Sequence, residues 1–217
     1  MTDFASRRLM MVDTQVRPSD VTKFPIIDAM LYVPREVFVP APLVELAYLG
    51  DNLRIAPDRV LLEPRALTKM LDALGLESDE LVLDLAVGMG YSSAVLARLA
   101  GKVVAVEPVE ELADAAEAAL QATGASNVVV ERGALTEGAA GHGPYDAMIL
   151  QGGIEIFPPA LSEQLKEGGR VVAIFMDNAL GVVRIGVKRH GAIRWRDVFN
   201  AAAPVLEGFT KERAFAL

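Results

Sequence analysis

Two glycines and two acidic residues are spaced as a nucleoside-binding site would require. The stretch VLDLAVGMGYSS, residues 82–93, is a run of β-formers followed by a loop that contains Gly88 and Gly90. Glycines let the backbone approach a ligand closely, and the helix expected after the loop offers free N–H groups. The next apolar run ends in Glu107, 19 residues after Gly88, close to the spacing of ~20 residues typical of a ribose-binding carboxylate. Together with Asp84 before the loop, these residues predict a site for a nucleoside cofactor.

The glycine pattern also indicates which kind of cofactor the loop suits. A dinucleotide fingerprint reads Gly-x-Gly-x-x-Gly, but here Ala86 takes the first position and Tyr91 the third. A dinucleotide-dependent dehydrogenase is therefore the least favoured interpretation. Asp84 and the Gly88-Met89-Gly90 segment favour a methyltransferase, whose cofactor has no pyrophosphate. Nearby carboxylates are compatible with a cationic sulfonium.

The elements that must position these residues follow from the hydrophobic pattern. Five short apolar runs predict buried parallel strands, with helices between them: LVLDL, KVVAVE, NVVVE, YDAMIL and GRVVAIF. The segment from residue 181 to 206 alternates apolar and polar residues around a His190-Gly191 turn, which predicts an antiparallel hairpin. Residues 1–75 are expected to be short helices broken by prolines. We predict an α/β, doubly wound, Rossmann-like seven-stranded sheet (residues 76–217) with a C-terminal antiparallel hairpin and a helical N-terminal attachment (residues 1–75).

Composition excludes several classes of function. The 217 residues carry a formal net charge of −8, which argues against binding to nucleic acid or to an anionic membrane surface. No cysteine is present, and neither histidine has metal-ligand spacing around it, so no metal is expected. No apolar run approaches the ~20 residues that cross a bilayer, and the N-terminus lacks a signal-peptide core. A cytoplasmic protein is expected; its oligomeric state is not predicted.

Several motifs, in order and with nearly gapless spacing, resemble one known family. MVDTQVRP and VPREVFVP are similar to the N-terminal signatures of the protein-L-isoaspartate O-methyltransferases, and VLDLAVGMGYSSAVLA is similar to their cofactor loop. VVAVEPVEELA, YDAMIL and PPALSEQLKEGGRVVAI continue the resemblance over nearly the whole chain. The resemblance implies S-adenosyl-L-methionine as cofactor and isoaspartyl-containing proteins or peptides as substrate, in the repair of damaged proteins.

The resemblance also implies a set of cofactor-binding residues, among which Glu107 would hold the ribose hydroxyls. The predicted set is Asp84, Ala86, Gly88, Gly90, Tyr91, Glu107, Pro108, Gly133, Ala134 and Gln151.

Four positions depart from the pattern of the family. The family's active-site serine falls on Leu62 and its neighbouring threonine on Val60; the first loop glycine is Ala86, and the acid that holds the adenine amine falls on Ala134. No catalytic residue is assigned, and Arg59 is the candidate for holding the acceptor carboxylate, because a guanidinium can bind a carboxylate bidentately. Two alternatives remain open: a weak or inactive member acting as a cofactor-binding or regulatory module, and a methyltransferase with a different acceptor.

Overall fold

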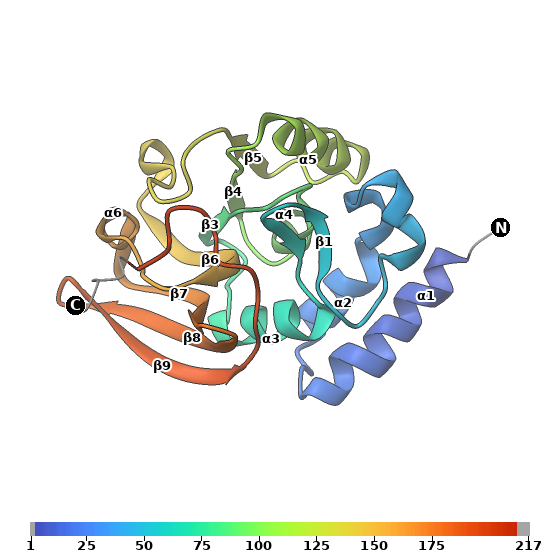
Figure 1. Cartoon of the computed structure of the whole chain (residues 1–217), viewed down its shortest axis with the longest axis horizontal. Coiled ribbons are helices and arrows are strands. Elements are labelled where there is room, and N and C mark those ends of the chain that lie inside the picture. Colours follow the sequence, from blue (N-terminus) through green and yellow to red (C-terminus); the bar gives the residue numbers. More distant parts are fainter. Residues whose placement is uncertain (1–2, 212–217) are drawn as a thin grey trace, which may run out of the picture.

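One seven-stranded sheet organises the computed structural model, which describes residues 3–211 (Figure 1). Its strands are β3 (Leu81–Leu85), β4 (Lys102–Val106), β5 (Val128–Glu131), β6 (Tyr145–Ile154), β7 (Leu165–Asp177), β8 (Leu180–Arg189) and β9 (Ala192–Asn200). The helices among them are α4 (Tyr91–Leu96), α5 (Glu110–Ala122), η5 (Ala140–His142) and α6 (Pro159–Glu163). The strand order is β5-β4-β3-β6-β7-β8-β9, with β3 to β7 parallel and β8 and β9 antiparallel. The predicted α/β class and the C-terminal hairpin are confirmed.

The order of the strands reverses at the centre of the sheet. The chain runs from β3 outward to β4 and β5, then returns to place β6 on the other side of β3. At such a switch point the loops that leave the two neighbouring strands diverge and open a crevice at the carboxyl edge. The glycine loop therefore begins where a ligand site is expected.

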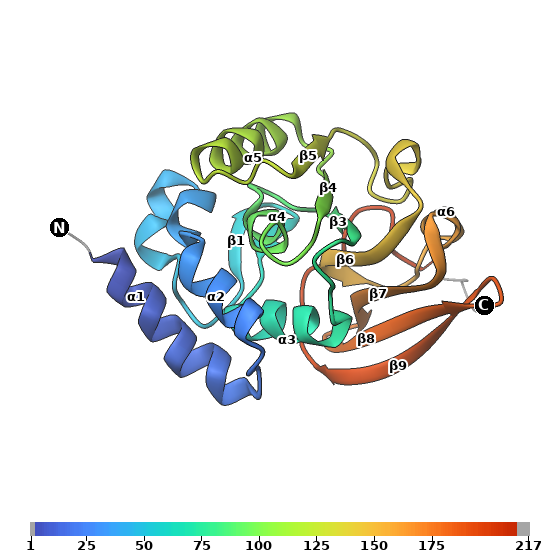
Figure 2. The same ribbon diagram turned by 180° about the vertical axis from the view of Figure 1, so that it is seen from behind.

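Both faces of the central strands are buried, which explains their continuous apolar runs. Successive side chains point to opposite faces: Val82 and Val103 belong to one hydrophobic cluster, while Leu83 and Val104 belong to a second. The first cluster joins the sheet to the N-terminal region, α4 and α5, and the second joins it to α6 and the C-terminal segment. Figure 2 shows α1 (Phe4–Met11) and the strand β9 at opposite ends of the molecule.

The N-terminal attachment is mainly helical, as predicted. Its elements are α1 (Phe4–Met11), η1 (Val12–Val16), η2 (Arg17–Ser19), α2 (Phe24–Tyr32), η3 (Arg35–Phe38), η4 (Ala41–Leu46) and α3 (Pro64–Leu74). Within it lies an antiparallel hairpin that the helical prediction for this region did not include, formed by β1 (Leu53–Ala56) and β2 (Arg59–Leu61). The hairpin is a separate two-stranded sheet. Its strands, of four and three residues, are too short for the pattern to indicate pairing, although Pro57 and Asp58 are common turn residues.

The carboxyl edge of β6 is covered by the chain's C-terminal segment. β6 extends beyond the predicted YDAMIL run because the backbone of Gly153 donates to Pro204 O at 2.8 Å and accepts from the Leu206 N–H at 2.9 Å. The approach is close: a Cβ on Gly153 would lie 2.6 Å from the carbonyl oxygen of Ala203. Only glycine permits this contact.

We therefore expect Gly153→Ala to displace the C-terminal segment and to lower the free energy of unfolding by ~1–3 kcal/mol, the usual cost of overpacking. Gly141→Ala is the matched control, because a Cβ there meets nothing within 4 Å and the backbone of Gly141 is not left-handed. Urea unfolding of both variants measures the difference, and equal stabilities would contradict the proposed close approach.

Candidate functional site

The carboxylate of Asp84 ties together three elements at the switch point. It accepts hydrogen bonds from the hydroxyls of Ser92 and Ser93 on α4, each at 2.7 Å, and from Gln151 Nε2 on β6 at 2.8 Å. Asp84 is fully buried, and this desolvation raises its pKa to about 6, although the three hydrogen bonds act in the opposite direction. The network fixes the ends of β3 and β6 relative to the first turn of α4.

The loop between β3 and α4 makes three left-handed backbone turns. Ala86, Gly88 and Gly90 have φ values of +63°, +56° and +90°. The left-handed conformation costs a residue with a Cβ ~1–2 kcal/mol, so the alanine at position 86 is strained where a glycine would not be. Its N–H donates to Val106 O at 3.0 Å, which holds the loop against β4. A Cβ on Gly88 would lie 2.5 Å from Ile55 Cδ1, so the β1–β2 hairpin packs directly on this loop.

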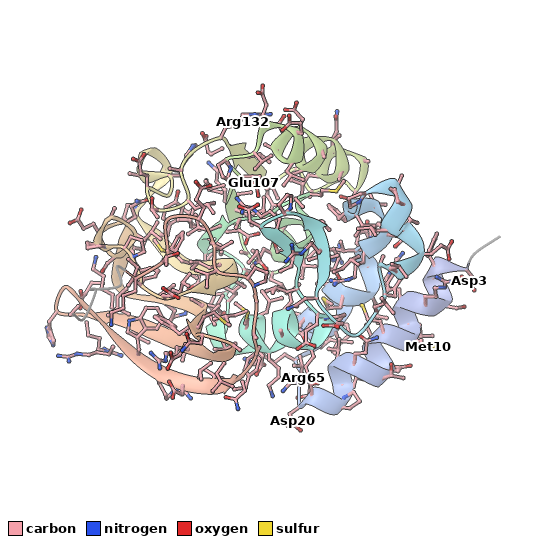
Figure 3. All side chains as sticks on the ribbon, in the orientation of Figure 1. Asp3, Met10, Asp20, Arg65, Glu107 and Arg132 are labelled. Carbon is pink, nitrogen blue, oxygen red and sulfur yellow. The ribbon has the colours of Figure 1, made fainter. Side chains whose placement is uncertain are left out.

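Glu107, directly after β4, lies beneath the loop with a wholly buried side chain. Its carboxylate accepts from the Gly88 N–H at 2.8 Å and from the Val109 N–H at 3.2 Å. Arg59, at the start of β2, places its Nε 3.0 and 3.2 Å from the two carboxylate oxygens. Figure 3 labels Glu107 inside the molecule, where the hairpin reaches it. The structure thus brings together the predicted loop, the predicted ribose acid and the predicted acceptor-binding arginine.

The remaining predicted cofactor residues do not all have side chains at the switch point. Gln151 joins the Asp84 network, whereas the side chain of Tyr91 lies in the core, 5.8 Å from the Phe38 ring and beneath the guanidinium of Arg35. Only the backbone of Tyr91 therefore belongs to the loop. Three further residues follow strand ends at the same edge of the sheet: Pro108 and Ala134, which are exposed, and Gly133, which is half-buried.

Leu62, at the position of the family serine, is 2% exposed and follows β2. Its carbonyl accepts a 2.7 Å hydrogen bond from Arg35 Nη2, and Arg35 Nε donates to the carbonyl of Ala47 at 2.6 Å. Arg35 is fully buried, which lowers its pKa, and its Nη1 has no hydrogen-bond partner within the described residues. Arg35 thus holds the backbone on which the acceptor side of the site would be built.

Sequence reasoning missed four residues that shape the site: Arg35, Ile55, Ser92 and Ser93. A signal existed for the two serines, which occupy the first turn of the helix after the glycine loop and can reach back to an acid at the end of the strand. Arg35 lies inside the VPREVFVP motif, although no role follows from the motif itself. Ile55 carries no such signal, because its contact with Gly88 is purely tertiary.

The fold and the site define a nucleoside-binding α/β protein of the doubly wound class. A strand, a glycine loop and a helix lead to a second strand that ends in a buried acid directly beneath the loop. Comparisons with known proteins identify the family within that class.

The family model described as "Protein-L-isoaspartate(D-aspartate) O-methyltransferase (PCMT)" matches residues 8–200. Among curated relatives, Protein-L-isoaspartate O-methyltransferase 1 of Rhodopseudomonas palustris (strain HaA2) is 39% identical over 171 residues, covering 79% of this chain and 70% of its own. The Protein-L-isoaspartate O-methyltransferase of Syntrophus aciditrophicus (strain SB) is 38% identical over 172 residues and covers 79% of each chain.

Solved structures agree in fold. A protein-L-isoaspartate O-methyltransferase superposes with a TM-score of 0.81 at 24% identity, over 93% of this chain and 66% of that one. A Plasmodium falciparum structure described as a putative protein-L-isoaspartate O-methyltransferase gives a TM-score of 0.79 at 16% identity, over 95% and 99% of the two chains. The chain belongs to the protein-L-isoaspartate(D-aspartate) O-methyltransferase family, which confirms the resemblance carried by its motifs.

The raised pKa of Asp84 predicts a specific pH dependence of stability. The folded protein keeps the proton up to about pH 6, whereas the unfolded chain loses it near 3.8. Stability from this group is therefore fully present below pH 3.8 and is lost as the pH rises through 6, by about 3 kcal/mol.

Asp84→Asn has no such titration, and an asparagine can keep contacts with Gln151 and with the two serines. The unfolding free energy of the variant minus that of the wild type, from urea unfolding between pH 3.5 and 7, should rise by about 3 kcal/mol. A difference that stays constant over this range would show that Asp84 titrates normally.

Proposed function

We propose that this chain transfers a methyl group from S-adenosylmethionine to the α-carboxylate of isoaspartyl residues in damaged proteins. The observation that supports this most is the 2.8 Å hydrogen bond from the Gly88 N–H to Glu107, because it brings the carboxylate that we expect to bind ribose beneath the glycine loop. The curated relatives at 38–39% identity are named for this activity. The Plasmodium falciparum relative is described in complex with S-adenosyl-L-homocysteine.

The residues at the switch point suit the chemistry of such a cofactor. Glu107 would accept from the ribose hydroxyls, and the loop amides around Gly88 and Gly90 would face the amino-acid portion. Asp84 and Gln151 would hold the loop in shape from behind. Ala134 offers no side-chain acceptor for the adenine amine, so one contact expected in the family is missing on this account. Glu107 is also paired with Arg59, whose Nε lies 3.0 Å from the carboxylate.

On the acceptor side, methyl transfer requires no covalent catalysis by a residue of the protein. The cofactor supplies an electrophilic methyl group, and a carboxylate nucleophile needs no base. The chain's own residues must orient the acceptor and exclude water, which can supply much of the rate. Leu62 cannot donate a hydrogen bond, so acceptor positioning would depend on backbone amides or on Arg59 once it is released from Glu107.

In this proposal the two regions of the chain bind different reactants. Residues 1–75 would form the acceptor side and residues 76–217 the cofactor side. No helix within residues 3–211 is long and apolar enough to cross a membrane. We propose a cytoplasmic location, with which the absence of cysteines is compatible. A cofactor-binding module without turnover is the second candidate, favoured by the buried Leu62.

Calorimetric titration tests the cofactor site. S-adenosylhomocysteine should bind the wild type, and Glu107→Gln should weaken binding by roughly 10- to 100-fold through loss of charge-assisted hydrogen bonds worth ~1.5–3 kcal/mol. Glu77→Gln is the control, because Glu77 is exposed and precedes β3 at the opposite edge of the sheet. Equal affinities of the three folded proteins would remove Glu107 from the site.

Methyl transfer to matched isoaspartyl and aspartyl peptides tests the acceptor side. We expect a slow wild type, and at least a roughly tenfold faster reaction for Leu62→Ser combined with Val60→Thr, because the hydroxyls would position the acceptor only in the transition state. Affinity for S-adenosylhomocysteine should stay nearly unchanged.

Leu62→Ala is the matched control, because it removes the same bulk without adding a hydroxyl. Melting temperatures must be measured alongside, since truncating a buried leucine costs ~2–5 kcal/mol. A double variant no faster than Leu62→Ala would refute the positioning account. Cofactor binding without transfer by any variant would instead support the module without turnover.

A further inference from the structure

We propose that Arg59 is an internal competitor for the cofactor: the β1–β2 hairpin closes the site by pairing Arg59 with Glu107, and S-adenosylmethionine binds only when this pair opens. The inference rests on the proposed function and adds a control of cofactor binding that belongs to this chain. It makes Arg59 the residue that sets the apparent affinity.

Three N–H groups already donate to the carboxylate of Glu107 in the closed arrangement. An ionised carboxylate offers about four lone-pair positions. The N–H of Arg59 Nε lies between the two oxygens, at 3.2 and 3.0 Å, and the N–H groups of Gly88 and Val109 donate at 2.8 and 3.2 Å. A ribose diol would need the positions that Arg59 fills.

Because the Arg59–Glu107 pair is buried, Glu107 cannot bind Arg59 and a ribose at the same time. The side chains of Arg59 and Glu107 are 1% and 0% exposed, so no ligand atom can reach the carboxylate past the guanidinium. Arg59 is itself held from its other side, where Nη1 donates to Asp58 Oδ2 at 2.9 Å and to the Asp58 carbonyl at 3.3 Å. Arg59 is therefore also held by Asp58, the preceding residue of the same hairpin.

The same hairpin covers the glycine loop with a second side chain. Ile55 on β1 lies against Gly88, and its neighbour Ala56 pairs with Arg59 across the hairpin. Both obstacles therefore belong to one small element that is not hydrogen-bonded into the main sheet. Asn52 anchors its base, accepting from the Glu63 N–H at 2.9 Å and donating to the carbonyl of Ala202 at 2.8 Å. A two-stranded hairpin with an anchored base can swing at its tip, because such an element is only marginally stable by itself.

The consequence for affinity follows from the two-state equilibrium. When only the open form binds, the apparent dissociation constant equals the intrinsic one divided by the open fraction. A neutral side chain at position 59 removes the charge-assisted bond and leaves Glu107 buried without a counter-charge in the closed form. Both effects favour the open form.

The test is calorimetric titration of S-adenosylhomocysteine into the wild type, Arg59→Gln and Arg54→Gln. Arg54 is the matched control, because it lies on β1 of the same hairpin, is exposed, and carries the same charge. We expect Arg59→Gln to bind at least tenfold more tightly than the wild type, and Arg54→Gln to stay within twofold. Hydrogen exchange of the backbone amides of residues 53–61 should be faster in ligand-free Arg59→Gln than in the ligand-free wild type.

Ile55→Ala provides a second route that leaves the ion pair intact. It removes the contact on Gly88 and should also tighten binding, by about two- to fivefold, through the open fraction. This variant decides the question if Arg59→Gln does not fold.

An unchanged or weakened affinity in folded Arg59→Gln, with binding to the wild type, would overturn the inference and leave the proposed function standing. Absence of binding to the wild type, to Arg59→Gln and to Ile55→Ala, all folded, would refute the cofactor itself and the proposed function with it.

Discussion

The buried carboxylate of Glu107 receives hydrogen bonds from three parts of the chain: the loop after β3, the start of α5 and the β1–β2 hairpin. A charge without access to water is costly unless it is paired and hydrogen-bonded, and Glu107 has both a counter-charge and two backbone N–H donors. One ionised group therefore holds the hairpin, the loop after β3 and the start of α5 in their positions. Because Arg59 provides the only charged contact to Glu107 among the described residues, the N-terminal attachment takes part in the electrostatics of the sheet.

Much of the scaffold could be predicted from local pattern. The apolar runs that became β3, β4 and β5 were located to within a residue, because strands buried on both faces are apolar throughout. β6 and β7 proved longer than predicted. Beyond an irregularity after Ile149, Gly153 and Ile154 of β6 still pair with Ile174 and Phe175 of β7, which the apolar run YDAMIL does not indicate. The β1–β2 hairpin was missed because its pairing depends on tertiary contacts with Gly88 and Glu107, which a window of a few residues cannot contain.

The candidate site also contains residues that local sequence spacing predicts and residues that only the tertiary structure reveals. The 19-residue spacing from Gly88 to Glu107 predicted two residues that the structure joins by a hydrogen bond. The partner of Arg59 lies 48 residues away and could not be inferred from spacing. Tyr91 follows the loop in sequence, yet the first turn of α4 directs its ring into the core. The left-handed backbone at Ala86 shows why a glycine is usual there, and its hydrogen bond to β4 shows how an alanine is tolerated.

The C-terminal segment has a consequence for the order in which the protein matures. The hydrogen bond from Asn52 to Ala202 spans 150 residues, and the cover over the end of β6 comes from residues 203–206. On a ribosome the N-terminal part of a chain emerges first, at about 5–20 residues per second. The base of the hairpin and the edge of the switch point therefore stay incomplete until residues 202–206 have emerged. A nascent chain that has reached only β9 still exposes the carboxyl edge of β6, next to the ligand site.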